Sequence, residues 1–303
     1  MHAGLRSEAL DRRTVAELLA EAERRLEAKE IEFPDASALW LLAHAMGIED
    51  PDELEEERTD ERVTLEAERR FQELVTRREA HEPYQYIVGV ADFRDVLMEV
   101  SHDVFLPRLQ SERMCDEIED WARKRRCADG WRIADLGTGC GAIAVSLALG
   151  RLRPRRVWAV DIAPAALDLA GRNARTHGVA DRVHAVAGDW LEMIRPEPCL
   201  DIVVAVPPYL NPEDERWLSE ETLRWEPLET FFGSPSGTEL LVRILDEAAS
   251  RLRPGGLVAL QLDADQVPAV EAYVNGDPDH PLTIEWILQD EDGDEDAVLA
   301  VKH

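Results

Sequence analysis

A glycine-rich segment, Asp135-Leu136-Gly137-Thr138-Gly139-Cys140-Gly141, follows an apolar stretch and precedes the helical run AIAVSLALG. Glycines at alternate positions allow the backbone to turn tightly beneath a ligand, and the helix that follows presents free N–H groups to it. This arrangement is typical of a loop that binds a nucleotide. The segment also fits the dinucleotide pattern G-x-G-x-x-A through Ala142, so the loop alone leaves the cofactor open. The residues of this loop that we expect at the cofactor are Asp135, Gly137, Thr138, Gly139 and Gly141.

Two further predicted strands end in carboxylates that a nucleoside could use. One ends at Asp161, whose carboxylate can accept hydrogen bonds from both ribose hydroxyls, and we place Ile162 beside it in the site. The next ends in Gly188-Asp189-Trp190, which offers a carboxylate to an adenine amino group and an indole to its ring. Each has a plainer alternative, since Asp161 could cap the helix that begins at Pro164 and Trp190 could belong to the core. Together, three successive strand ends favour a nucleoside site.

The fourth predicted strand ends in Val206 and runs into Pro207-Pro208-Tyr209, which distinguishes a methyltransferase from a dehydrogenase. Two consecutive prolines stiffen the chain and lack an N–H, so their carbonyl groups are held outward as acceptors. Such a carbonyl can position an N–H of the substrate and leave the nitrogen lone pair aimed at a sulfonium methyl group. Tyr209 adds an aromatic wall on which a cationic centre can rest. We therefore predict an N-methyltransferase that uses S-adenosylmethionine and releases S-adenosylhomocysteine, with Pro207 and Tyr209 as catalytic residues.

The composition limits the other classes of function. Hydrophobic residues make up 45% of the 303 residues, which is enough for a packed core, and no apolar run reaches the length of about 18 residues that a membrane span needs. The start of the chain lacks the apolar stretch of a signal peptide, so we expect a soluble cytoplasmic protein with no membrane partner. A formal net charge of −29 repels polyanions, so we expect no nucleic-acid partner. The four cysteines are widely spaced, which predicts free thiols and no metal site.

The periodicity of the apolar residues divides the chain into a helical part and an α/β part. Helical spacing over 15–26, 36–46 and 65–79 predicts a cap domain of residues 1–80, in which Thr14 and Glu17 resemble a capping box. Residues 81–108 form a predicted linker with short extended segments at 84–89 and 97–100. Residues 109–303 alternate strands and helices, which predicts a Rossmann-like parallel sheet ending in an antiparallel hairpin. The predicted strands are 131–135, 156–161, 183–187, 201–206, 256–262, 283–289 and 297–302.

In several segments, among them 135–141 and 207–209, the chain resembles the HemK/PrmC family, whose members methylate the glutamine of peptide chain release factors. The resemblance extends over nearly the whole chain and implies a class I methyltransferase domain behind a helical cap that helps to select the acceptor. It also places Arg108 against the cofactor. The cap could act as a lid, a docking surface or the contact of a homodimer. The segments that carry the resemblance are 82–89 with Phe93, 105–108, 135–141, 207–209, 218–227, 232–233 and Gly237.

Two segments depart from the family pattern where the acceptor is chosen. The family has Asn-Pro-Pro-Tyr, in which the asparagine amide holds the amide of the target glutamine, and here that position is Val206. Losing a buried hydrogen-bonding partner of this kind costs about 1 to 3 kcal/mol. The family's Pro-Arg-Pro-Glu-Thr-Glu segment is Pro-Arg-Leu-Gln-Ser-Glu over residues 107–112. From these changes we infer that methyl transfer is retained and that the acceptor has changed.

Acidic residues beyond Tyr209 suggest a new acceptor, because carboxylates pair well with a guanidinium or ammonium group. We therefore expect a small cationic amino acid as the substrate, most specifically the guanidino nitrogen of arginine, with Glu221 as a further catalytic residue. Two alternatives stay open: methylation of release-factor glutamine, and a SAM-cyclising or other SAM-consuming enzyme of natural-product biosynthesis. The expected substrate contacts are Val206, Pro207, Pro208, Tyr209, Glu220, Glu221 and Glu226.

Overall fold

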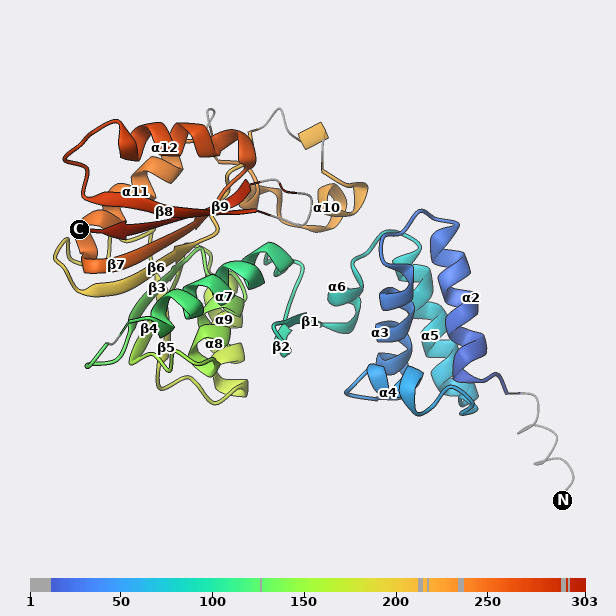
Figure 1. The fold of residues 1–303 in the computed structure, drawn as a ribbon. Coiled ribbons are helices and arrows are strands. Elements are labelled where there is room, and N and C mark those ends of the chain that lie inside the picture. Colours follow the sequence, from blue (N-terminus) through green and yellow to red (C-terminus); the bar gives the residue numbers. More distant parts are fainter. Residues whose placement is uncertain are drawn as a thin grey trace, which may run out of the picture. The chain divides into compact units, whose positions relative to one another are not determined.

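The computed structural model of the protein describes residues 12–125, 127–211, 215–216, 218–233, 237–289, 293 and 295–303. The chain divides into two compact units, Met1–Gly89 and Val90–His303, which we call the helical unit and the sheet unit. In the described ranges, no helix has both the length and the apolar character that crossing a membrane requires. The helices of the first unit are α2 (Val15–Glu27), α3 (Pro34–Met46), α4 (Asp52–Glu56), α5 (Leu65–Arg78) and α6 (Tyr84–Val88), shown in blue and cyan in Figure 1.

The helical unit is held by an apolar core to which α2 and α5 each turn one face, whereas α3 is buried on nearly all sides. The predicted capping box is confirmed at the start of α2, where the Thr14 hydroxyl accepts from the N–H of Glu17 and the Glu17 carboxylate accepts from the N–H of Thr14. Gly47 ends α3 in the left-handed conformation. The largest buried side chains of this core are Leu18, Leu26, Leu41, Leu42, Leu54 and Phe71.

Residues 84–89, expected to be extended, form the short helix α6, so that prediction was wrong. The N–H of Ile87 donates to the carbonyl of Pro83 at 3.1 Å, and the N–H of Gly89 donates to the carbonyl of Gln85 at 2.8 Å. Gly89 then leaves the helix with a φ of 83°, a conformation that favours glycine. Aromatic and β-branched residues mimicked a strand here, but Ile87 is buried in the core of the helical unit.

The sheet unit contains a small hairpin and a seven-stranded sheet. In the large sheet the order is β5-β4-β3-β6-β7-β9-β8, and the pairs are parallel except for those that β9 makes with β7 and β8. This confirms the predicted Rossmann-like sheet with an antiparallel C-terminal hairpin. The hairpin strands are β1 (Val90–Phe93) and β2 (Val96–Glu99). The strands of the sheet are β3 (Arg132–Leu136), β4 (Arg156–Asp161), β5 (Val183–Ala187), β6 (Leu200–Ala205), β7 (Leu252–Gln261), β8 (Leu282–Gln289) and β9 (Glu295–Lys302).

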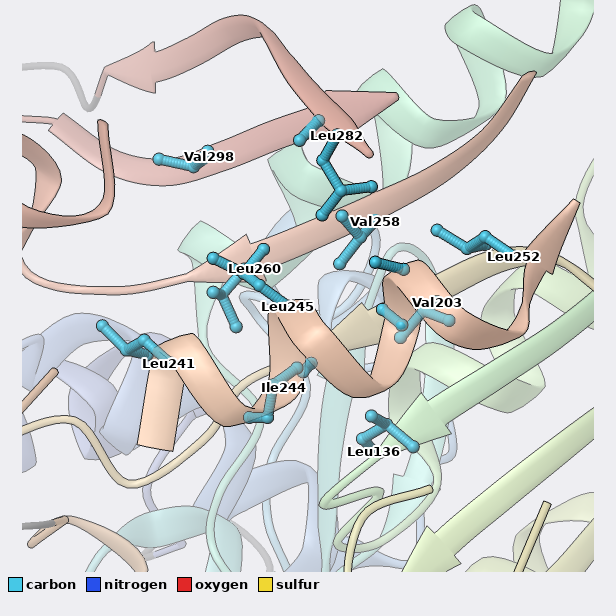
Figure 2. Close-up of a cluster of buried hydrophobic side chains, with 14 of the residues drawn as sticks. Leu136, Val203, Leu241, Ile244, Leu245, Leu252, Val258, Leu260, Leu282 and Val298 are labelled. Carbon is cyan, nitrogen blue, oxygen red and sulfur yellow. The ribbon is translucent and has the colours of Figure 1, made fainter. Parts of the chain in front are cut away.

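Helices cover both faces of this sheet (Figure 1). Helices α7 (Leu109–Arg123), α8 (Ala142–Leu149) and α9 (Pro164–Thr176) pack in succession on one face, whereas α11 (Glu239–Arg251) and α12 (Val267–Asn275) pack on the other. Figure 2 shows the second layer, in which Leu241, Ile244 and Leu245 of α11 gather with apolar side chains of β3, β6 and β7. The remaining short helices are α10 (Glu220–Trp225), η2 (Leu228–Thr230) and η3 (Ala264–Gln266).

The strand order brings the functional segments together. Because β3, β4, β5 and β6 are neighbours and parallel, the segments that follow all four strands emerge at one edge of the sheet. The crevice outside the carboxyl ends of parallel strands is where open α/β sheets bind ligands. The four segments singled out in the sequence are these four strand ends.

Candidate active site

A cavity of about 470 Å³ lies at the carboxyl ends of β3 to β6. Residues from the loop after each of these strands line it, together with the segment before α7 and the end of β7. Most of the predicted site residues are among them: Arg108, Gly137, Thr138, Gly139, Asp161, Ile162, Gly188, Asp189, Trp190, Val206, Pro207, Pro208 and Tyr209.

The glycine-rich loop takes a backbone path that side chains would obstruct. Gly137, Gly139 and Gly141 have φ values of 68°, 55° and 84°, in the left-handed region that favours glycine. A Cβ on Gly141 would lie 2.9 Å from the Cβ of Ala170, so α9 packs directly against the loop. The N–H of Gly139 donates to the carboxylate of Asp161 at 3.0 Å, which ties the loop to the end of β4.

We expect Gly141→Ala to destabilise the protein by about 2 to 3 kcal/mol, because the new methyl group adds a contact with Ala170 to the strain of a left-handed backbone. Gly178→Ala is the matched control. Gly178 has a φ of +66° with no atom within 4 Å of the added Cβ, so it should lose only about 1 kcal/mol. Urea unfolding of the two variants measures the difference, and equal losses would show that α9 does not press on the loop.

Asp135 lies beneath the loop and does not line the cavity. Its carboxylate accepts from the Thr138 hydroxyl at 2.6 Å and from the N–H of Ala144 at 3.1 Å, so it joins the loop to the first turn of α8. Only 1% of the residue is exposed, and this burial raises the pKa of its carboxyl to about 7. Asp135 therefore acts on a ligand through the loop that it holds.

Asp161 and Ile162 present a polar and an apolar group side by side. Both oxygens of Asp161 already accept a backbone N–H, from Gly139 and from Ala163 at 2.9 Å, which fixes the carboxylate in one orientation. A carboxylate has about four acceptor sites, so it can still accept from vicinal hydroxyls. Ile162 is 75% exposed although it is a large apolar residue, and it lines the cavity. This pair fits the ribose and the base of a nucleoside.

The end of β5 is strained where it meets the cavity. Trp190 has a φ of 51°, an uncommon conformation for a bulky residue, and such strain is concentrated at functional sites. Its ring carbons lie 3.7 and 3.9 Å from the position of a Cβ on Gly137, so the indole borders the glycine loop. Asp189 lines the cavity and also pairs with Arg243 of α11 at 3.1 Å. Any contact of Asp189 with an adenine amino group would share its carboxylate with Arg243.

The segment after β6 is held at its second proline and at the tyrosine that follows. A Cβ on Gly233 would lie 2.2 Å from the carbonyl oxygen of Pro208, so Gly233 covers that carbonyl. The carbonyl of Tyr209 accepts from the side-chain amide of Gln266 at 2.7 Å. Burial raises the pKa of the Tyr209 hydroxyl, which therefore stays protonated at neutral pH. With the Pro208 carbonyl covered, Pro207 is the better candidate for binding a substrate N–H.

Aromatic residues that the sequence analysis did not assign to the site enclose this end of the cavity. The rings of Phe105 and Phe231 meet edge to face with centroids 5.0 Å apart, and both residues line the cavity. Cys140 lines it too, but burial raises the pKa of its thiol to about 12. Cys140 is therefore a protonated thiol at neutral pH and not a ready nucleophile. The apolar wall that Phe105 and Phe231 form would exclude water from a reacting group.

The three glutamates expected to bind the substrate do not lie at the cavity, and here the prediction requires correction. None of Glu220, Glu221 and Glu226 is among the described residues that line it. Glu226 is buried and accepts from the Arg108 guanidinium and from the N–H of Leu106. A buried carboxylate needs such partners, so this one is held by the chain itself. The acidic stretch 211–215 lies partly outside the described residues.

Asn173 on α9 positions the glycine loop, and sequence reasoning missed it. Its amide donates to the carbonyls of Cys140 at 2.8 Å and Glu99 at 3.0 Å, and its oxygen accepts from the N–H of Glu99 at 2.8 Å. The residue is 1% exposed, so all of these bonds are shielded from water. One side chain thus ties β2 and the glycine loop to α9. The sequence signal, an asparagine within an amphipathic helix, is too common to single it out.

We expect Asn173→Ala to lower the free energy of unfolding by about 2 kcal/mol, because it leaves buried backbone groups without their partner. Asn275→Ala, at the exposed end of α12, should change it by less than about 0.5 kcal/mol. Chemical denaturation of both variants tests this. A neutral result for Asn173→Ala would mean that the carbonyls it binds are satisfied without it.

The chain is similar to known proteins in both units. It matches the family model of the PrmC N-terminal domain over residues 17–89 and that of a methyltransferase domain over residues 133–225. Release factor glutamine methyltransferase of Moorella thermoacetica is 39% identical over 259 residues, which are 85% of this chain and 88% of that protein. Its counterpart in Gloeobacter violaceus is 39% identical over 208 residues, or 68% and 71% of the two chains. The crystal structure of the hMettl16 catalytic domain, in complex with a hairpin of the MAT2A 3'UTR, covers 68% of this chain and 75% of its own, with a TM-score of 0.52 at 16% identity, a likeness of fold alone.

Proposed function

Since the chain belongs to the release factor glutamine methyltransferase family, we propose that it methylates the side-chain amide nitrogen of a glutamine in a peptide chain release factor. The protein is an S-adenosylmethionine-dependent methyltransferase. The observation that carries the proposed acceptor is identity of 39% over 85% of the chain, which includes both units and not only the cofactor-binding fold. The proposed place of the reaction is the cytoplasm, where release factors act.

The expectation that the acceptor is a small cationic amino acid, with arginine as its sharpest form, is wrong. Relatives of known name at 34 to 39% identity are release factor glutamine methyltransferases. In addition, Glu220, Glu221 and Glu226, which were expected to bind a guanidinium, are not among the described residues that line the cavity. The further alternative, a SAM-cyclising or other SAM-consuming enzyme of natural-product biosynthesis, is supported by none of these names.

The cavity residues fit the methyl donor by their chemistry. S-adenosylmethionine supplies an electrophilic methyl group on a sulfonium when it is bound. On the proposed arrangement, the Asp161 carboxylate accepts from the ribose and the exposed Ile162 covers a face of the adenine. The glycine loop brings its backbone close to the ligand, and Asp135 holds that loop from below.

The other end of the cavity would hold the glutamine amide. The Pro207 carbonyl accepts one N–H of the amide, while Tyr209, Phe105 and Phe231 surround it with aromatic surface. In the reaction the nitrogen forms a bond to the methyl carbon, the electron pair of the broken bond stays on sulfur, and the nitrogen releases a proton to solvent. The chain accelerates this step by holding the nitrogen in line with the bond between the methyl carbon and sulfur. Such orientation of two reactants can lower the free-energy barrier by roughly 7 to 11 kcal/mol relative to reactants free in solution.

Formation of S-adenosylhomocysteine with different acceptors tests the proposal. We expect turnover with release factor, and none with free arginine, without an acceptor, or with a release factor whose target glutamine is replaced by alanine. Turnover that persists in the alanine variant would place the methyl group on another residue. Turnover with no acceptor at all would contradict methyl transfer to a protein.

A further inference from the structure

Val206 leaves one side of the acceptor site without a polar side chain, and the neighbouring strand supplies one. In the parallel pairing of β6 with β7, Ala205 is the last residue of β6 and lies opposite Leu260. Val206 follows β6 directly and so comes next to Gln261, the last residue of β7. Gln261 is only 3% exposed, yet it lines the cavity together with Val206 and Tyr209. A buried carboxamide therefore stands beside the position where the family pattern has its asparagine.

The carboxamide of Gln261 is held in a defined orientation. Its Oε1 accepts from the hydroxyl of Ser111 at 2.9 Å, and Ser111 is itself buried at the start of α7. Tyr209 lines the same cavity, and the interaction of its hydroxyl with the Gln261 side chain lowers the pKa of that hydroxyl against the larger effect of burial. With Oε1 held by Ser111, Nε2 is the other polar atom of the carboxamide, and this nitrogen carries two hydrogens. These hydrogens can be donated to a ligand in the cavity.

We propose that Gln261 binds the acceptor directly, by donating an Nε2 hydrogen to the carbonyl oxygen of the substrate amide. The inference rests on the proposed function, because it assigns the other half of the same amide that the Pro207 carbonyl would hold. A substrate carbonyl buried against Val206 alone would lose its hydrogen bond with water, at a cost of about 1 to 3 kcal/mol. Gln261 removes that penalty, so valine at position 206 is compatible with a glutamine acceptor.

The test is a cycle of Gln261→Met, Val206→Asn and the double variant, assayed with release factor as acceptor. Methionine keeps the volume of glutamine and removes both polar ends. We expect Gln261→Met to lower kcat/KM for release factor roughly 10- to 100-fold, the kinetic equivalent of one lost hydrogen bond of this kind. The dissociation constant of S-adenosylmethionine, measured by calorimetry without acceptor, should change less than about threefold.

If Gln261 binds the acceptor directly, a carboxamide at position 206 should be able to replace the one at position 261. Val206→Asn should raise kcat/KM at least tenfold when Gln261 is methionine. It should raise kcat/KM far less when Gln261 is present, because the effects of two residues that share one binding partner are not additive. Ser111→Ala is the matched control: it loosens the carboxamide without removing it, and should cost less than Gln261→Met.

The outcomes separate this inference from the proposed function. No turnover of release factor by the unaltered enzyme would overturn the proposed function. Normal turnover together with a Gln261→Met variant of unchanged kcat/KM would overturn the role of Gln261 alone. A loss that appears equally in cofactor affinity and thermal stability, and that Val206→Asn does not rescue, would show that Gln261 only supports the fold.

Discussion

Asp135→Asn is expected to remove a fall in stability that the cofactor-free protein shows between about pH 4 and pH 7. Burial raises the pKa of Asp135 from 3.8 to about 7 in the folded chain. Between these two values the folded state holds a proton that the unfolded state has released, so the free energy of unfolding decreases as the pH rises. Above about pH 7 the full penalty applies, on the order of 4 kcal/mol, because one pKa unit corresponds to about 1.4 kcal/mol.

Urea unfolding at pH 5 and pH 8 measures this effect. Between pH 5 and pH 8, the free energy of unfolding should fall by more in the unaltered protein than in Asp135→Asn. Every other titrating group is common to both proteins, so the difference is due to Asp135. Asparagine can still accept from Thr138 and Ala144 through its oxygen, so the loop keeps its two hydrogen bonds. Parallel stability curves for the two proteins would show that Asp135 titrates near its ordinary pKa.

Asp161→Asn is expected to weaken S-adenosylmethionine binding by roughly 100-fold or more. Both carboxylate oxygens accept backbone N–H groups, from Gly139 and Ala163, and an amide NH₂ at either position would face a donor. The ribose would also lose hydrogen bonds to a charged acceptor, each contributing about 1.5 to 3 kcal/mol. The side chain therefore acts twice, on the cofactor and on the loop beneath it.

Isothermal titration calorimetry gives the dissociation constants. Asp168→Asn, on the exposed face of α9, removes the same charge from the same part of the chain and should leave the affinity within about twofold. If both variants bind alike, the carboxylate of Asp161 does not contact the cofactor.

The cofactor end of the site was predictable because each of its parts follows a strand. The apolar stretches before Asp135, Asp161 and Asp189 are parallel neighbours in the sheet, and parallel order alone brings their ends together. The sequence could not show that Asp135 lies under the loop while Asp161 lines the cavity, because both are aspartates that follow apolar residues. Burial separates them, and burial depends on α8 packing above Asp135.

The acceptor end was harder because its residues come from distant segments. Ser111 and Gln261 are 150 positions apart and meet only when α7 lies across the end of β7. The available sequence signal for Gln261 was a polar residue near the end of a predicted strand. The sequence did not show that Gln261 lies beside Val206, because the order of the strands in the sheet decides which segments are neighbours. Glu226 gave the opposite error: its position suggested a substrate contact, whereas the fold pairs it with Arg108.

Val206 carried most weight in the expectation of a changed acceptor, because one position was interpreted without its neighbours. Hydrogen bonds in a buried site belong to a network, and a donor lost from one strand can be supplied by the next. The carboxamide of Gln261 beside Val206 is such a donor.

The proposed function is the transfer of a methyl group to a glutamine side chain of a release factor. Peptide mass spectrometry, after the protein has reacted with S-adenosylmethionine and release factor, tests it directly by locating the methyl group. We predict one added methyl group on the side-chain nitrogen of a single glutamine, absent when S-adenosylmethionine is omitted. A methyl group on an arginine or lysine, or an unmodified release factor after S-adenosylhomocysteine has formed, would contradict the claim.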